Sequence, residues 1–325
     1  MGPIATTIAR LYGTRGWIAL GGFAAVLFVV FPLFSLALPS GSPFHLSPYW
    51  VTLVGKIMCY AIVALAMDLV WGYAGILSLG HGLFFALGGY AMGMHLMRQI
   101  GREGQYQSEL PDFMVFLDWK EYPWHWWNTD QFWWAMLLFF RNATGFGGNN
   151  GFTDFKRILG FTIATPETRM ALFAVTGAAL IGALLLGRWL VTSRFGRVLM
   201  AIRDAEQRVA FCGYNTVNYK LFVWTLSAVL CGIAGALYVP QVGIINPSEM
   251  SPANSIEIAI WVAVGGRGTL AGAIVGAGVV NGAKSFFTQA FPEYWLYVLA
   301  LLFILVTLFL PQGIVGLLRQ WRTAR

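Results

Sequence analysis

Residues 170–191 read MALFAVTGAALIGALLLGRWLV, an apolar run whose only charged side chain is Arg188. The hydrocarbon core of a membrane is roughly 30 Å thick, and about 20 residues of α-helix cross it. The run is long enough and apolar enough to predict a membrane-spanning helix. The rest of the chain repeats this pattern.

Similar runs predict an all-α polytopic membrane protein with about eight transmembrane helices in a single domain, residues 1–325. The first run could be a signal peptide, because Arg10 and Arg15 precede it, but its length favours an uncleaved helix. The sixth run is short and begins with polar residues. The expected spans are 17–38, 49–70, 74–97, 170–191, 220–243, 252–265, 269–287 and 294–311.

The composition argues against a soluble domain, because 58% of residues are hydrophobic and only 11% are charged. Soluble domains carry about a quarter charged residues. The net charge of +7 could indicate nucleic acid, but the basic residues lie between apolar runs, as in cytoplasmic loops. The three cysteines and four histidines are too scattered for a metal motif, so we expect free thiols, no metal and no nucleic-acid partner.

The distribution of arginine predicts the orientation, because cytoplasmic loops are enriched in Lys and Arg. Arg10 and Arg15 place the N-terminus inside, and eight crossings return the C-terminus, with Arg322, to the same side. The loop 192–219 and the turn at Arg267 are also expected inside. Both termini are therefore predicted to be cytoplasmic.

Residues 98–169 break the pattern of apolar spans. They mix acidic and basic side chains and are rich in tryptophan, which favours the headgroup layer of a membrane. We expect an extracytoplasmic, aromatic-rich cap whose segments lie on the membrane or fold back into the protein.

A dense run of glycines occupies residues 72–90, at the start of the third expected span. Glycine allows close helix packing, but it also allows a helix to break where it lines a cavity. Polar side chains within and before the run favour a translocation pathway over packing alone, because such groups are expensive within a membrane. The candidate pathway residues are Asp68, Tyr73, Gly75, Ser78, Gly80 and His81.

Residues 193–208 predict a short amphipathic helix on the cytoplasmic side. Val198, Ala201 and Ile202 share its apolar side, and Arg197 and Asp204 lie opposite. Such a helix can dock into a groove on a soluble partner. From composition alone, the segment could equally well be a solvated loop that lies on anionic membrane lipid.

A second glycine-rich stretch, residues 265–276, places glycines at every fourth position from Gly268, which favours helix packing over ligand binding. Just before it, Glu257 is either a pathway residue or an interfacial charge. Residues 278–285 lack the Gly-Lys-Ser/Thr of a phosphate-binding loop, because Ala283 separates Gly282 from Lys284. We therefore expect no nucleotide site and no cofactor in this chain.

The motifs in 72–90, 193–220 and 265–272 occur in the order found in the second permease of branched-chain amino acid ABC importers, which the chain resembles. The resemblance implies that the "GRxxxAIRDxE" pattern forms the coupling helix that docks onto an ATPase. The residues that match this pattern are Gly196, Arg197, Ala201, Ile202, Arg203, Asp204 and Glu206.

Within that family the chain is most similar to the urea permeases, in the segments that start at Leu110, Leu137 and Tyr238. The resemblance implies a bacterial inner-membrane complex with a second related permease, two ABC ATPases that use the ATP, and a periplasmic urea-binding protein. Between Asp130 and Leu137 the chain is shorter than this branch leads us to expect, by roughly a pair of membrane segments.

The leading hypothesis is therefore an ATP-driven importer of urea or a short amide. The alternatives are a branched-chain amino acid permease and a passive channel or ion-coupled carrier. A membrane enzyme would need clustered carboxylates or histidines within the spans, and we see no such cluster in the sequence.

Overall fold

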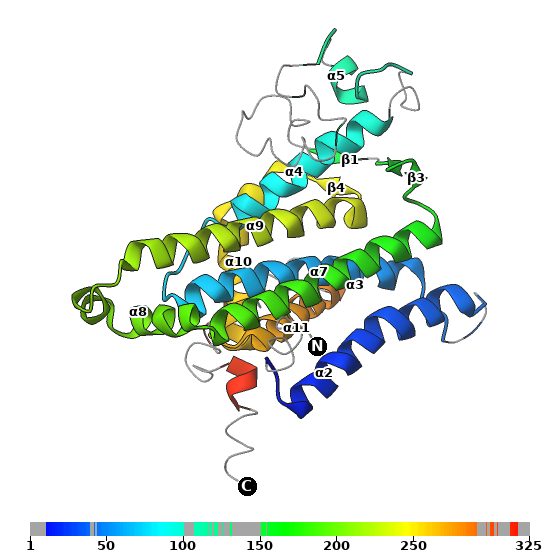
Figure 1. Cartoon of the computed structure of the whole chain (residues 1–325). Coiled ribbons are helices and arrows are strands. Elements are labelled where there is room, and N and C mark those ends of the chain that lie inside the picture. Colours follow the sequence, from blue (N-terminus) through cyan, green and yellow to red (C-terminus); the bar gives the residue numbers. More distant parts are fainter. Residues whose placement is uncertain are drawn as a thin grey trace, which may run out of the picture.

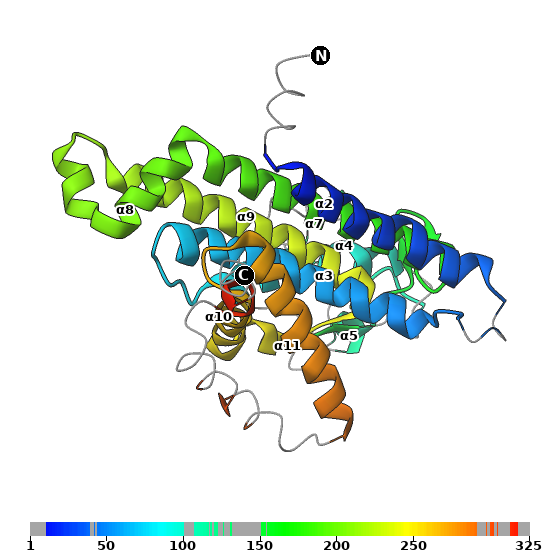
Figure 2. The same cartoon turned by 90° about the horizontal axis from the view of Figure 1, so that it is seen from below.

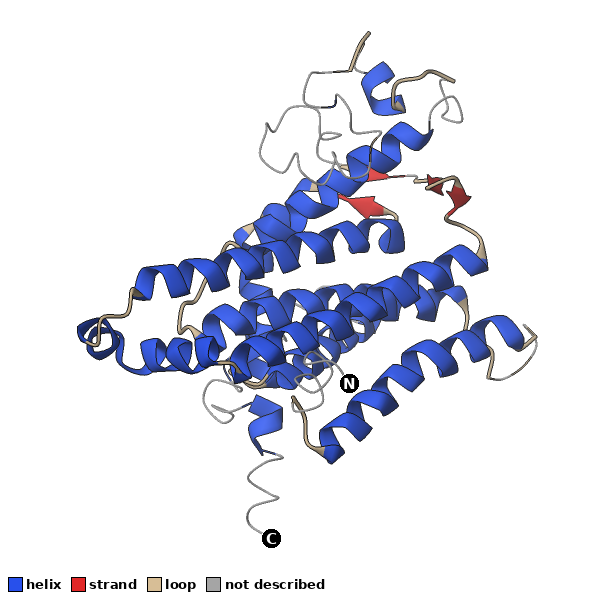
Figure 3. Ribbon diagram, viewed as in Figure 1, coloured by secondary structure: helices blue, strands red, loops and turns tan. Residues whose placement is uncertain are grey.

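The computed structural model describes residues 11–39, 44–100, 107–116, 151–153, 155–290 and 313–317, together with isolated positions between these ranges. These residues form a helical bundle, and the strands among them are short and lie near one end of it (Figures 1 and 3). The longer helices are α2 Thr14–Ala25, α3 Pro48–Asp68, α4 His81–Ile100, α7 Pro166–Thr192, α8 Arg194–Phe211, α9 Thr216–Val242, α10 Pro252–Gly265 and α11 Leu270–Ala290. The shorter elements are η1 Val26–Val30, η2 Leu33–Ala37, η3 Leu69–Tyr73, α5 Asp112–Phe116, β1 Phe152–Thr153, β2 Arg157–Ile158, β3 Phe161–Thr162, β4 Ile244–Ile245 and η7 Pro247–Met250.

Five of the expected spans are confirmed as helices long and apolar enough to cross a membrane. The first is widened into π-turns, η1 and η2, on either side of Pro32. Proline lacks a backbone N–H and clashes with the preceding turn, which accounts for the local widening. The five helices are Thr14–Ala37, Pro48–Tyr73, Pro166–Thr192, Thr216–Val242 and Leu270–Ala290.

The third expected span is wrong at its start, because residues 74–80 are not helical and α4 begins only at His81. Gly75 has φ of +77°, a left-handed backbone that glycine adopts at little cost. The sixth span, α10, has 14 residues and reaches roughly 21 Å, less than a full crossing. The eighth, 294–311, lies almost entirely outside the described residues.

Helix α3 forms the centre of the bundle, beside α7, α9, α10 and α11 (Figure 2). Its side chains at positions 61–70 are all buried. The π-helix η3 continues this central helix, and the broken segment 74–80 follows η3, so the break adjoins the core of the bundle.

Glycines bring α4 and α9 into backbone contact. A Cβ on Gly235 would collide with the carbonyl oxygen of Phe85 and lie 2.9 Å from the amide nitrogen of Gly89. Glycines bring α10 and α11 together in the same way, since a Cβ on Gly276 would lie 2.9 Å from the Cα of Gly265. The expected packing role of the second glycine-rich stretch is thus confirmed at Gly276.

The described part of region 98–169 lies at the end of α4 remote from α8 (Figure 1). Strand β1 pairs antiparallel with β4, joining Phe152 to Ile245. Trp126 is fully buried, and its carbonyl oxygen accepts a hydrogen bond of 2.7 Å from Arg98 Nη1. Trp126 therefore folds back into the protein. All the other tryptophans of the region lie outside the described residues.

Candidate functional site

Four segments expected on the cytoplasmic side meet at one end of the bundle. Arg188 Nε, at the end of α7, donates to the carbonyl oxygen of Leu11 at 3.0 Å. The C-terminal segment 313–317 also reaches this end, because a Cβ on Gly313 would collide with the Cα of Gly266 in the α10–α11 turn. The loop with α8 joins the same end through Arg203. This convergence agrees with the orientation that the arginine distribution predicts.

The end of the central helix α3 is held to the α10–α11 turn by Asp68. This side chain is fully buried in α3, and its Oδ1 accepts a hydrogen bond of 2.6 Å from the amide of Gly268. A Cβ on Gly72 would lie 2.8 Å from Gly268 Cα, so the close approach requires glycine there. Asp68 thus has a structural partner that the sequence did not reveal, and its place in the translocation pathway stays a prediction.

Arg203 joins α8 to the same point. Its Nη1 donates to the carbonyl oxygen of Gly72 at 2.7 Å, and its Nε donates to Asp204 at 2.9 Å. A Cβ on Gly75 would lie 2.8 Å from the Cγ of Arg203. We call Asp68, Gly72, Arg203 and Gly268 the junction, because they connect α8, the end of the central helix and the α10–α11 turn through two short hydrogen bonds.

Helix α8 begins with a side-chain cap, in which Ser193 Oγ accepts from the amide of Gly196 at 3.2 Å. Its buried residues are Gly196, Leu199 and Ile202, which recur every third position. Ala201 is exposed, so its predicted place on the apolar side is wrong. The helix also continues past the expected end at residue 208, to Phe211, with a kink at Ala205.

The exposed side of α8 carries Arg197, Asp204 and Glu206, as the helical spacing predicts for the first two. Glu206 accepts a hydrogen bond from Lys220 Nζ at the start of α9, and this bond lowers the pKa of the carboxyl. The ion pair connects the two ends of the loop between α8 and α9. The exposed charges remain available to a soluble partner.

His81, at the start of α4, connects three helices. Its Nε2 lies 2.6 Å from Ser227 Oγ on α9, and that hydroxyl donates to the carbonyl oxygen of Ala66 on α3 at 2.7 Å. Because the hydroxyl hydrogen is engaged, Nε2 must be the donor to Ser227. Ser78 and Gly80 lie half-buried in the broken segment between this contact and the junction.

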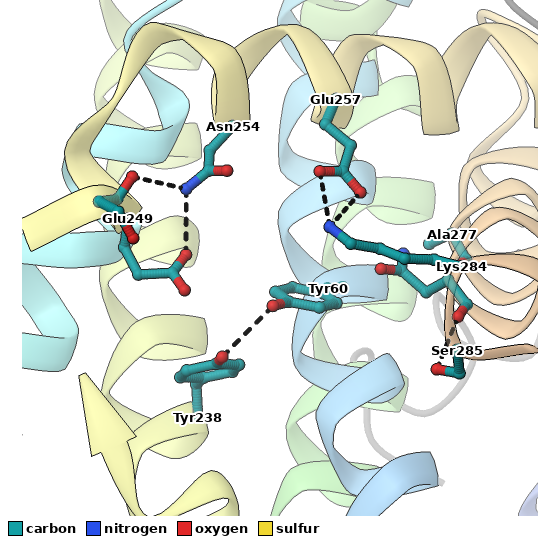
Figure 4. Close-up of polar contacts among 10 residues, drawn as sticks. Tyr60, Tyr238, Glu249, Asn254, Glu257, Ala277, Lys284 and Ser285 are labelled. Atoms are coloured by element: carbon teal, nitrogen blue, oxygen red, sulfur yellow. Dashed lines mark hydrogen bonds and ion pairs between the residues drawn. The ribbon is translucent and has the colours of Figure 1, made fainter. Parts of the chain in front are cut away.

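Tyr73 is buried beside the junction, whereas Glu257 belongs to a separate cluster. Both oxygens of Glu257 lie 2.8 Å from Lys284 Nζ on α11 (Figure 4). Sequence reasoning considered Lys284 only as part of a failed phosphate-loop pattern. Its position within an apolar span was the available signal, because charges in spans are rare and usually functional.

The chain matches the sequence profile of the family described as the permease component of branched-chain amino acid transport systems, over residues 49–140 and 131–307. The chain belongs to this family. It is therefore a multi-pass membrane protein and the permease component of an ABC-type transporter, and such permeases are not enzymes. The two matched stretches overlap at residues 131–140, beside the point at which the chain is shorter than expected.

Three relatives are similar over most of their length. The high-affinity branched-chain amino acid transport system permease protein LivM of Escherichia coli K12 is 24% identical over 335 residues, covering 87% of this chain and 74% of LivM. LivM of Salmonella typhimurium is 22% identical over 320 residues, covering 85% and 72%. BraD of Pseudomonas aeruginosa is 23% identical over 293 residues, covering 79% and 91%. No solved structure gives a significant match to the chain.

Proposed function

We propose that the chain is the membrane permease of an ATP-driven importer for urea or a related short amide. The contact between Arg203 and Gly72 carries this proposal, because it connects the exposed cytoplasmic helix to η3, which leads into the broken segment 74–80. A passive channel has no need of such a connection. The resemblance to urea permeases supports the choice of solute.

The proposed partners follow from the same interpretation. One of two ATPase subunits docks on α8, a second related permease completes the membrane path and receives the other ATPase, and a periplasmic protein delivers the solute. Membrane lipid surrounds the bundle, and the partner subunits use the ATP, so this chain itself holds no cofactor.

The mechanism we propose is alternating access. Closure of the ATPases moves α8, and Arg203 transmits this movement to the carbonyl of Gly72 and hence to residues 74–80. Asp68 carries the movement on to the α10–α11 turn through the amide of Gly268. Movement on the cytoplasmic side thereby changes the packing of α3, α10 and α11 together.

The relatives named for branched-chain amino acids supply the second candidate solute, most simply tested with leucine. Urea is small and neutral, and its passage needs a few hydrogen-bonding groups and no net charge. The periplasmic partner then determines most of the specificity for the solute. The permease makes a second selection among solutes along the translocation path.

Uptake by proteoliposomes containing the complete transporter tests the proposal. We expect ATP-dependent uptake of labelled urea, which Arg203→Glu abolishes because it removes the donor to Gly72. Arg208→Glu, an equal change of charge at an exposed position of α8, should retain most of the uptake. ATP-dependent uptake of leucine instead of urea would reject the solute, and ATP-independent flux through this chain alone would reject the importer.

A further inference from the structure

A small cavity lies between α3, α10 and the 3₁₀ helix η7, outside the junction. Its volume is about 60 Å³, and Tyr60, Glu249, Glu257, Trp261 and Lys284 contribute to its lining. Figure 4 shows Glu249 and Glu257 near Tyr60, with Lys284 reaching Glu257 from α11. The cavity therefore combines carboxylates, an ammonium group and aromatic rings within the membrane-spanning part of the chain.

The polar atoms around this cavity are incompletely paired. Trp261 is only 4% exposed, and its indole Nε1–H has no hydrogen-bond acceptor among the described residues. Glu249 accepts one hydrogen bond of 3.2 Å from Asn254. A carboxylate offers about four acceptor positions, so Glu249 and Glu257 can both accept further donors. A buried N–H without an acceptor is unfavourable, so a ligand whose oxygen reaches Trp261 from the cavity would relieve it.

These groups define the chemistry of a suitable ligand. It must offer an oxygen acceptor to Trp261 and N–H donors to the two carboxylates. The charges of Lys56, Glu249, Glu257 and Lys284 sum to zero, which favours a neutral ligand. The rings of Tyr60 and Trp261 pack against each other, with centroids 4.9 Å apart, and both contribute apolar surface to the lining. A primary amide meets all of these requirements.

The volume limits the size of the ligand. A cavity of about 60 Å³ is small, so it favours a ligand with few non-hydrogen atoms. Urea, with one carbon, one oxygen and two nitrogens, fits. Leucine has more than twice as many non-hydrogen atoms as urea, so the small cavity favours urea over leucine.

A larger cavity of about 370 Å³ lies next to the small one, lined in part by Lys56, Asn281 and Thr288. Tyr60 and Lys284 line both cavities. The ion pair between Lys284 and Glu257 therefore lies at the boundary between them. A solute that enters the small cavity can replace the ammonium with its own N–H groups at Glu257, so the carboxylate stays hydrogen-bonded throughout.

We propose that the small cavity binds one urea-sized amide during transport. Trp261 donates to the carbonyl oxygen, Glu249 and Glu257 accept from the amino groups, and the contact between Lys284 and Glu257 opens to admit the solute. This inference rests on the proposed function, since it assigns a site to the solute that the importer carries.

Trp261→Phe in the complete transporter tests the site, because it keeps the ring and removes only the N–H. The matched control is Trp189→Phe, at a position on α7 that is 48% exposed. We expect Trp261→Phe to lower the urea moved per ATP hydrolysed by roughly three- to tenfold, the value of one hydrogen bond. The half-saturating urea concentration, which the periplasmic protein sets, should stay unchanged, and Trp189→Phe should behave as the wild type.

The outcomes separate this inference from the proposed function. If the wild-type complex imports urea, and Trp261→Phe and Glu257→Gln both move as much urea per ATP as Trp189→Phe, the cavity is not the site and the proposed function stands. If the wild-type complex imports leucine and not urea, the proposed solute and this site are both wrong. A reduced urea-to-ATP ratio in Trp261→Phe and Glu257→Gln, with unchanged half-saturation, supports the site.

Discussion

Replacement of Gly235 by alanine tests the close crossing of α4 and α9. The added Cβ would meet the carbonyl oxygen of Phe85 and the amide nitrogen of Gly89, and both are backbone atoms that cannot rotate away. Overpacking of this kind costs about 1–3 kcal/mol, and the contacts with backbone place this site at the upper end. Alanine also favours the helix over glycine by about 0.5–1 kcal/mol, which offsets part of this cost. The free energy of unfolding should therefore fall by about 2 kcal/mol.

The matched control is Gly182→Ala, in the interior of α7. A Cβ on Gly182 meets no atom within 4 Å, so only the gain in helix propensity remains. At about 2–4 °C per kcal/mol, Gly235→Ala should lower the unfolding midpoint by roughly 4–8 °C, and Gly182→Ala should raise it by about 1–4 °C. The two identical substitutions thus change the midpoint in opposite directions.

The buried cysteines supply the assay. Cys59 and Cys231 are 0% exposed, so a thiol-reactive fluorophore labels them only as the purified protein unfolds on heating. Cys212 is exposed and is replaced by serine to remove the background. A midpoint for Gly235→Ala equal to or above that for Gly182→Ala would refute the backbone contact between α4 and α9.

Two further predictions concern the cytoplasmic end. The hydrogen bond from Lys220 lowers the pKa of Glu206, so its stabilisation is present above the ordinary glutamate pKa of about 4.3 and is lost as the pH falls through the lowered value. A spin label on Cys212 should therefore become more mobile as the pH falls through the lowered pKa of Glu206. In Glu206→Gln the label should already be mobile at about pH 7. A wild-type spectrum for that variant at the same pH would contradict the ion pair. Arg188→Ala removes the hydrogen bond that holds the N-terminal segment, worth about 1 kcal/mol, and should speed trypsin cleavage after Arg15 roughly fivefold in a digestion time course. An unchanged rate would show that this contact does not restrain the segment.

The sequence predicts the helical spans well because each depends on local composition. Long apolar runs such as 170–191 need no knowledge of their neighbours, since the membrane itself selects them. The break at 74–80 was visible as glycine density, but its position was not. That position depends on Asp68 and Gly268, which are 200 residues apart in the chain and meet only in the folded bundle.

The candidate sites show the same limit. The pattern that contains Arg203 was recognisable, whereas its acceptor, the carbonyl of Gly72, is a backbone atom without any sequence signature. Glu257 stood out as a charge in a short span, but its partner Lys284 lies one helix further on. Hydrogen bonds and ion pairs between helices depend on how the helices pack. They cannot be read from a single sequence.

The most direct test of the central claim, that α8 drives the broken segment through Arg203, is rescue by a disulfide. A Cβ on Gly75 would lie 3.6 Å from the Cβ of Arg203, within the range for a disulfide. Arg203→Cys alone should lose ATP-driven urea uptake. We expect the double variant Arg203→Cys with Gly75→Cys to regain uptake when its disulfide is oxidised and to lose uptake again when the disulfide is reduced. Verified disulfide formation with no gain in uptake over the reduced protein would contradict it.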